Sequence, residues 1–133
     1  MIAVDTNVLV RLLVNDPNTP EQSQQARELL NAQGEVWVGQ IVLIETVWVL
    51  QSSYKFSKDQ IISVLERLIQ HPNIHLENIT SLDNALTIFS ASNVGFSDCV
   101  ILNEAQRQQL VLYTFDRKLS QLHGAKPVGN MSE

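Results

Sequence analysis

The chain opens with MIAVDTNVLV, residues 1–10, and this stretch decides the fold. A short apolar run rich in β-branched residues meets a carboxylate at Asp5, and apolar residues then recur with helical spacing at Val8, Leu9 and Leu12. The pattern predicts a buried strand, an acid at its tip and then a helix. Ligands of open α/β sheets gather at the carboxyl ends of the strands, where Asp5 would lie. The alternative is that Asp5 only caps the following helix.

The composition is that of one globular domain. The chain has 133 residues, of which 44% are hydrophobic and 17% are charged. These proportions exclude a disordered segment, and a chain of this length buries roughly two thirds of its unfolded surface. We therefore expect a single domain over residues 1–133. The formal net charge of −5 excludes a strongly basic nucleic-acid-coating protein. It does not exclude a nuclease whose acids are neutralised by bound metal.

Cysteine usage and the apolar runs bear on the compartment. Cys99 is the only cysteine, so no intramolecular disulfide can form and a reducing interior suits the chain. Asp5 and Arg11 interrupt the N-terminal apolar stretch, which is not typical of a signal peptide. No uninterrupted apolar run is long enough to span a bilayer. We expect a cytoplasmic protein that does not enter the membrane.

Beyond the first segment, short apolar strands alternate with helical patterns. The predicted strands are residues 36–38, 74–77, 110–114 and 125–128. The predicted helices are residues 21–32, 41–50, 57–70, 81–89, 97–109 and 117–122. Residues 41–50 suit a strand or a helix by composition, and their length favours a helix. This alternation predicts a parallel, three-layer α/β domain.

Four acids lie beside or inside apolar segments rather than on polar faces: Asp5, Glu45, Asp98 and Asp116. Asp5 and Asp116 end predicted strands, Asp98 begins a helix, and Glu45 interrupts the most apolar run. In a parallel sheet these positions can converge on one edge. Buried carboxylates are costly unless they are paired or bound to a cation, and oxygen ligands select Mg²⁺ or Mn²⁺. Helix-terminal roles are the alternative for Asp98 and Asp116, and a satisfied buried acid is the alternative for Glu45.

Four motifs occur in order over nearly the whole chain: Ala3–Leu9, Ile44–Glu45, Gly95–Asp98 and Tyr113–Leu119. Together they resemble the motifs of the PIN-domain ribonucleases, and more closely those of the VapC-like toxins of toxin–antitoxin pairs. The resemblance implies an α/β/α PIN-like domain with a central parallel sheet of four or five strands. It also implies a metal-dependent endoribonuclease that hydrolyses RNA phosphodiester bonds.

The resemblance assigns roles to particular residues. It implies that the four acids, Asp5, Glu45, Asp98 and Asp116, are catalytic and gather around one or two Mg²⁺ or Mn²⁺ ions. Two neighbours, Asn7 and Thr114, would orient the acids or a water molecule. Three basic residues near the motifs could contact RNA phosphates, although exposed basic residues are more often only solvated. These are Arg11, Arg117 and Lys118.

The apolar helix around Glu45 suggests a partner, because one sheet cannot cover a helix that is apolar on nearly every side. Trp48, Val49 and Tyr54 are candidates for a subunit interface, and full burial within the monomer is the alternative. The resemblance implies a homodimer, or a hetero-oligomer with a small antitoxin protein that covers the active site. The competing hypothesis is a non-catalytic PIN-like protein-binding module.

Overall fold

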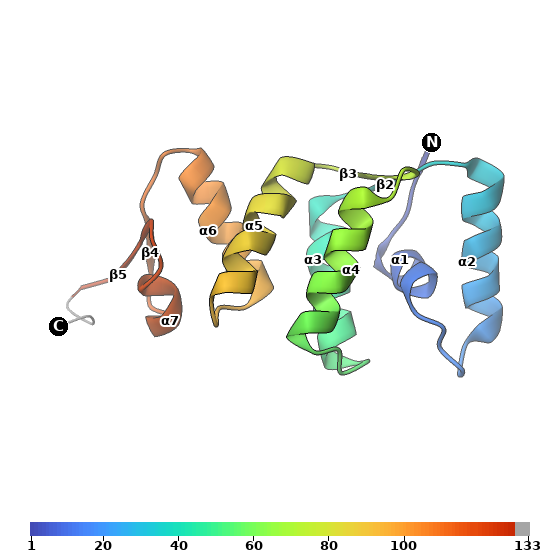
Figure 1. The fold of residues 1–133 in the computed structure, drawn as a ribbon, viewed down its shortest axis with the longest axis horizontal. Helices are drawn as coiled ribbons and strands as arrows, with labels where there is room; N and C mark the ends of the chain where they lie inside the picture. Colours follow the sequence, from blue (N-terminus) through green and yellow to red (C-terminus); the bar gives the residue numbers. More distant parts are fainter. Residues whose placement is uncertain (130–133) are drawn as a thin grey trace. The chain divides into compact units, whose positions relative to one another are not determined.

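The computed structural model describes residues 1–129. The chain divides into two compact units, Met1–Ile79 and the segment from Thr80 onward, whose positions relative to each other are not determined. Each unit combines helices with parallel strands (Figure 1). This finding confirms the predicted α/β class. Within residues 1–129, no helix has both the length and the apolar character needed to cross a membrane.

The first unit contains a three-stranded parallel sheet with β2 at its centre. Strand β2 (Val36–Val38) pairs with β1 (Ile2–Ala3) on one side and with β3 (Ile74–Leu76) on the other. The helices of this unit are α1 (Thr6–Leu13), α2 (Pro20–Gln33), α3 (Gln40–Ser52) and α4 (Lys58–Gln70). Residues 41–50 are therefore helical, as their length predicted, whereas β1 is shorter than the apolar run at the start of the chain.

Local sequence explains where these helices begin and end. The Asp5 side chain caps α1, and Ser57 and Gln60 form a reciprocal capping box at the start of α4. Pro20 occupies the first turn of α2, where its missing N–H costs no helical hydrogen bond. Gly34 ends α2 with a φ of +80°, a conformation that glycine adopts without a steric penalty.

Strand β2 shows how the core of the first unit is built. Val36 and Val38 are each 1% exposed, whereas Trp37, which points to the opposite face, is 39% exposed. This alternation is the period of a strand with one buried face. Helices α1 and α3 contact each other. Their contact brings the segment after β1 close to the helix that carries Glu45.

The second unit is built from α5 (Ile79–Ala91), α6 (Phe96–Arg107), β4 (Leu112–Thr114), α7 (Arg117–Ser120) and β5 (Ala125–Pro127). Strands β4 and β5 pair in parallel. Phe89 and Phe96 pack edge to face with ring centroids 5.7 Å apart, which joins α5 to the start of α6. Buried Asn103 of α6 donates hydrogen bonds to the hydroxyl and carbonyl oxygens of Ser81 in α5. The second unit therefore has its own core, and that core positions the start of α6.

Candidate active site

In the first unit, Asp5 and Glu45 are linked through Thr6, the first residue of α1. The Asp5 Oδ1 atom accepts a hydrogen bond from the backbone N–H of Val8 at 3.1 Å, so Asp5 does cap α1. Its other carboxylate oxygen has no hydrogen-bond partner among residues 1–129 and stays available for a ligand. Thr6, the next residue, donates its hydroxyl to Glu45 Oε1 at 3.3 Å. This bond holds the Glu45 side chain against the start of α1.

Glu45 is exposed in the first unit, which corrects the expectation that it is a buried acid. Helical periodicity is the reason. Leu43, Val47 and Leu50 form the buried side of α3, whereas Glu45 and Trp48 lie on its exposed side. The apolar residues that surround Glu45 in the sequence therefore do not surround it in space.

In the second unit, Asp98 and Asp116 interact. Asp98 is half-buried in the first turn of α6, and Asp116 follows β4 and caps α7 through the backbone N–H of Leu119 at 2.8 Å. Burial raises the pKa of Asp98, and the negative charge of Asp116 raises it further. Thr114 Oγ1 accepts the backbone N–H of Asp116 at 2.9 Å, so Thr114 positions the backbone of this acid. Negative charge therefore accumulates beside the end of β4.

The donor chemistry of both pairs fits a hard divalent cation. Each pair supplies only carboxylate oxygens, the ligands that Mg²⁺ and Mn²⁺ prefer. Asp116, like Asp5, uses one oxygen as a helix cap and keeps the other free of hydrogen bonds from residues 1–129. Within residues 1–129, no three or more His, Cys, Asp or Glu side chains form a group that could hold a metal ion. Two acids come from each unit, so the gathering of all four stays a prediction.

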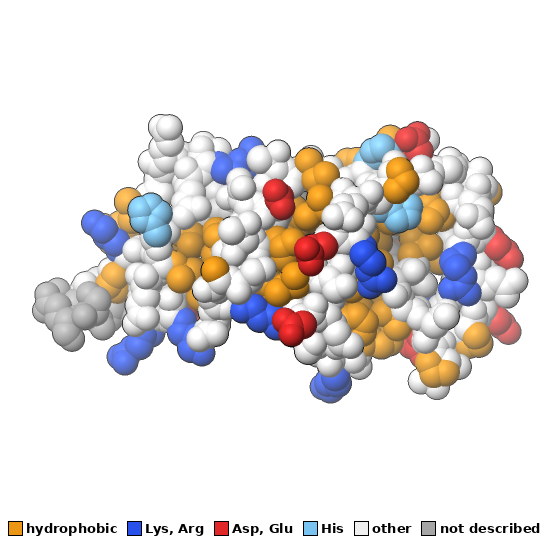
Figure 2. All heavy atoms as spheres, viewed as in Figure 1, with side chains coloured by type: hydrophobic (Ala, Val, Ile, Leu, Met, Phe, Trp, Pro, Cys, Tyr) orange, Lys and Arg blue, Asp and Glu red, His pale blue; other side chains and the backbone are white. Residues whose placement is uncertain are grey.

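The three basic residues differ in their surroundings. Arg11 donates from Nε to Gln22 Oε1 at 2.9 Å and from a terminal nitrogen to the Tyr54 hydroxyl at 3.1 Å. Arg117 and Lys118 are exposed on α7, directly after Asp116. On the face shown in Figure 2, the lysine and arginine side chains of the described residues are scattered and form no continuous basic surface. The formal net charge of −5 likewise makes general electrostatic attraction a weak basis for nucleic-acid binding.

A pocket of about 460 Å³ lies beside Asp5, between α1 and α2. Its lining from α1 and the residue before it consists of Asp5, Asn7, Val8 and Arg11. Its lining from α2 consists of Gln22, Gln25, Ala26 and Leu29. The α2 residues were not predicted as site residues. Their spacing of three, four and seven positions places them on one helix face, and that signal was present in the sequence.

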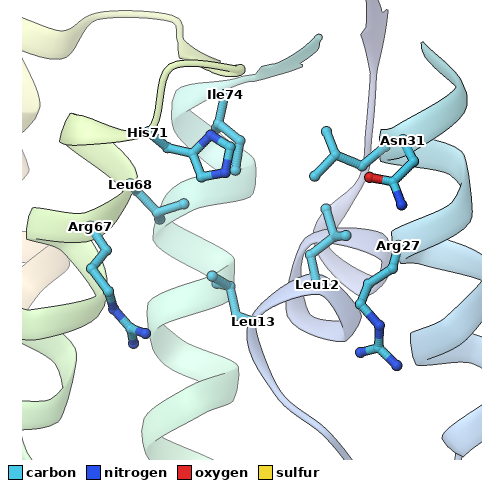
Figure 3. Close-up of a pocket in the computed structure, with 9 residues that line it drawn as sticks. Leu12, Leu13, Arg27, Asn31, Arg67, Leu68, His71 and Ile74 are labelled. Atoms are coloured by element: carbon cyan, nitrogen blue, oxygen red, sulfur yellow. The ribbon is translucent and has the colours of Figure 1, made fainter. Parts of the chain in front are cut away.

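A second pocket, of about 380 Å³, contains none of the four acids. Leu12, Leu13, Leu68 and Ile74 line it, and Arg27 and Arg67 lie on its opposite sides (Figure 3). The Arg27 guanidinium is hydrogen-bonded to Asn15 at 3.0 Å. The pocket beside Asp5 is therefore the one associated with the predicted site.

Comparison with known proteins identifies the family of this chain. The PIN domain family matches residues 2–125. A VapC ribonuclease of Aquifex aeolicus (strain VF5) is 27% identical over 135 residues, an alignment that covers 100% of this chain and 99% of the relative. With a family match over nearly its whole length and an α/β fold of parallel strands, the chain belongs to the PIN domain family.

Proposed function

We propose that this chain is a metal-dependent endoribonuclease that hydrolyses RNA phosphodiester bonds. The observation that carries the proposal is the proximity of two acids, Asp98 in the first turn of α6 and Asp116 at the end of β4. Like charges this close repel each other, and a bound cation removes the repulsion. The full-length similarity to a VapC ribonuclease supports RNA as the substrate.

We assign the four acids Asp5, Glu45, Asp98 and Asp116 as the ligands of Mg²⁺ or Mn²⁺. When bound, such a cation neutralises phosphate charge and makes a coordinated water more acidic. The chain itself orients the ligands. Thr6 holds Glu45 through its hydroxyl, and Thr114 fixes the backbone that carries Asp116. Asn7 is exposed two residues after Asp5, lines the same pocket and is placed to orient a water or a phosphate.

The biological role that we propose is that of the toxin in a toxin–antitoxin pair that acts in the cytoplasm. The similarity to a VapC ribonuclease supports this role, and the partner would be a cognate antitoxin protein. We also propose a homodimer that uses the exposed side of α3. Trp48 is 67% exposed there, whereas Tyr54 is hydrogen-bonded to Arg11 and Asp16 within the first unit. Trp48 is therefore the interface candidate to test first.

The test of the nuclease is cleavage of a mixed set of RNAs by antitoxin-free protein with Mg²⁺, Mn²⁺ or EDTA. We expect metal-dependent cutting that Asp5→Asn and Asp98→Asn each reduce by roughly a hundredfold or more, because each change removes a ligand charge. Asp59→Asn is the matched control. Asp59 and Asp98 each lie in the first turn of a helix, α4 and α6 respectively, and Asp59 is exposed. The Asp59→Asn variant should leave cutting unchanged.

The result that would overturn the proposal is equally specific. If folded wild-type protein binds metal but cuts none of the RNAs, the chain is a PIN-like protein-binding module without catalysis. Cutting that persists in EDTA or in the Asp98→Asn variant would instead remove the metal and the assigned acids from the mechanism.

A further inference from the structure

We infer that the pocket between α1 and α2 binds one nucleobase of the RNA strand, and that Gln25 and Gln22 contact the edge of that base. The inference rests on the proposed ribonuclease function and assigns base preference to this site. The pocket volume of about 460 Å³ lies within the range of roughly 300–1,000 Å³ that is usual for ligand pockets.

The lining has the two kinds of surface that a nucleobase requires. Val8, Ala26 and Leu29 provide an apolar wall against which the face of a base can pack. Asn7, Gln22 and Gln25 provide amide groups, which donate to and accept from the polar edge of a base. A phosphate alone would use neither the apolar wall nor the acceptor atoms of the amides. A base therefore matches this pocket better than an isolated anion does.

Gln22 is held in place by a chain of hydrogen bonds. Asp16 accepts the Tyr54 hydroxyl at 2.8 Å, Tyr54 accepts from Arg11 at 3.1 Å, and Arg11 donates from Nε to Gln22 Oε1 at 2.9 Å. Because its oxygen is occupied, the Gln22 amide can offer mainly its NH₂ group to a ligand. A fixed donor favours bases that present an acceptor at that point. Arg11 acts here as a positioning residue rather than as a phosphate contact.

Gln25 lies one turn further along α2, and its side chain has no hydrogen-bond partner among residues 1–129. Its amide can therefore both donate and accept when a base enters. Asp5 lines the same pocket, so a base bound there belongs to a nucleotide whose backbone passes the proposed catalytic acid. A base can enter such a pocket only when it is unpaired and unstacked, which selects single-stranded or looped RNA.

The test compares Gln25→Ala with Gln24→Ala. Gln24 is the next residue of α2, is exposed outside the pocket and hydrogen-bonds to Glu28 at 3.0 Å, so it controls for the loss of a glutamine from this helix. Cleavage is measured on oligonucleotides that differ only in the base next to the cut. We expect wild type and Gln24→Ala to share one base preference, and Gln25→Ala to reduce the ratio between the best and worst base by about tenfold.

A binding measurement separates the inference from the nuclease proposal. Fluorescence anisotropy of labelled A, C, G and U homopolymers in EDTA needs no catalysis, and the ranking of their affinities should flatten in Gln25→Ala only. If no RNA is cut but this flattening occurs, the nuclease proposal fails and the pocket assignment stands. If Gln25→Ala keeps the wild-type preference in both measurements, the pocket assignment is wrong, whatever the cleavage rate.

Discussion

At the scale of single residues, the ionised Asp98 side chain is a proposed metal ligand but lowers the stability of the metal-free fold. Burial, and then the charge of Asp116, raise the pKa of Asp98 above the ordinary value of 3.8. The folded state therefore holds the Asp98 proton more tightly than the unfolded state does. The stability that this proton provides is fully present below pH 3.8 and is lost as the pH rises through the folded-state pKa. At neutral pH the ionised Asp98 consequently destabilises the metal-free fold.

Replacing Asp98 with asparagine should make the metal-free protein more stable at pH 7, because the uncharged amide removes the cost of partly burying a charge and also the repulsion from Asp116. We expect a rise in Tm of about 1–3 °C, a small change because a half-exposed carboxylate is partly screened by solvent. The gain should shrink as thermal melts in EDTA are repeated toward pH 4. A lower Tm for Asp98→Asn than for the Asp59→Asn control at pH 7 would contradict this account.

At the scale of secondary-structure elements, the Tyr54 hydroxyl joins three segments of the first unit. It accepts from Arg11 in α1 and donates to Asp16 in the link before α2, while Tyr54 itself follows α3. The pKa of Asp16 is lowered mainly by the hydrogen bond from the backbone N–H of Asn18. The hydrogen bond from Tyr54 lowers it further. Desolvation and the bond to Asp16 raise the pKa of Tyr54. The lowered pKa of Asp16 favours its ionised form, and the raised pKa of Tyr54 favours its protonated form. These are the forms in which the Tyr54 hydroxyl donates to the Asp16 carboxylate.

Tyr54→Phe should therefore destabilise the first unit by about 1 kcal/mol, the usual net contribution of such hydrogen bonds. Urea unfolding monitored by circular dichroism measures the change. If the network also holds Gln22 through Arg11, Tyr54→Phe should weaken base preference while leaving metal-dependent cutting intact. If Tyr54→Phe has the same free energy of unfolding as wild type, the network contributes nothing to stability.

The elements themselves were largely predictable, because their signals are local. The length of the apolar run at residues 41–50 predicted α3, and Ser57 with Gln60 marked the start of α4. Asp5 and Asp116 each accept a hydrogen bond from a backbone N–H at a helix start, so both do cap helices, and whether they also bind metal stays a prediction. What the sequence did not reveal depends on distant pairs. The bond from Arg11 to Tyr54 joins residues 43 positions apart, and the one from Thr6 to Glu45 joins residues 39 positions apart. No local pattern encodes either pairing.

At the scale of the whole molecule, α3 connects the proposed assembly with the proposed site. Ile41 and Trp48, which are 73% and 67% exposed, lie on the same side of α3 as Glu45, at spacings of four, three and seven residues. Large apolar side chains exposed next to each other mark an interaction surface more often than single ones do. A homodimer that covers this surface would border a candidate catalytic acid, so its assembly would affect access to Glu45.

The Trp48→Gln variant tests this arrangement. Light scattering after size-exclusion chromatography should give wild type twice the 15.0 kDa mass of one chain and give Trp48→Gln the mass of one chain. Because Trp48 is exposed, the variant should keep its circular dichroism spectrum. Ile101→Gln is the control, since Ile101 is 47% exposed on α6 of the second unit and should not change the mass. A dimer that survives Trp48→Gln places the interface elsewhere. A monomeric wild type removes the dimer, and the exposed side of α3 is then left for another partner.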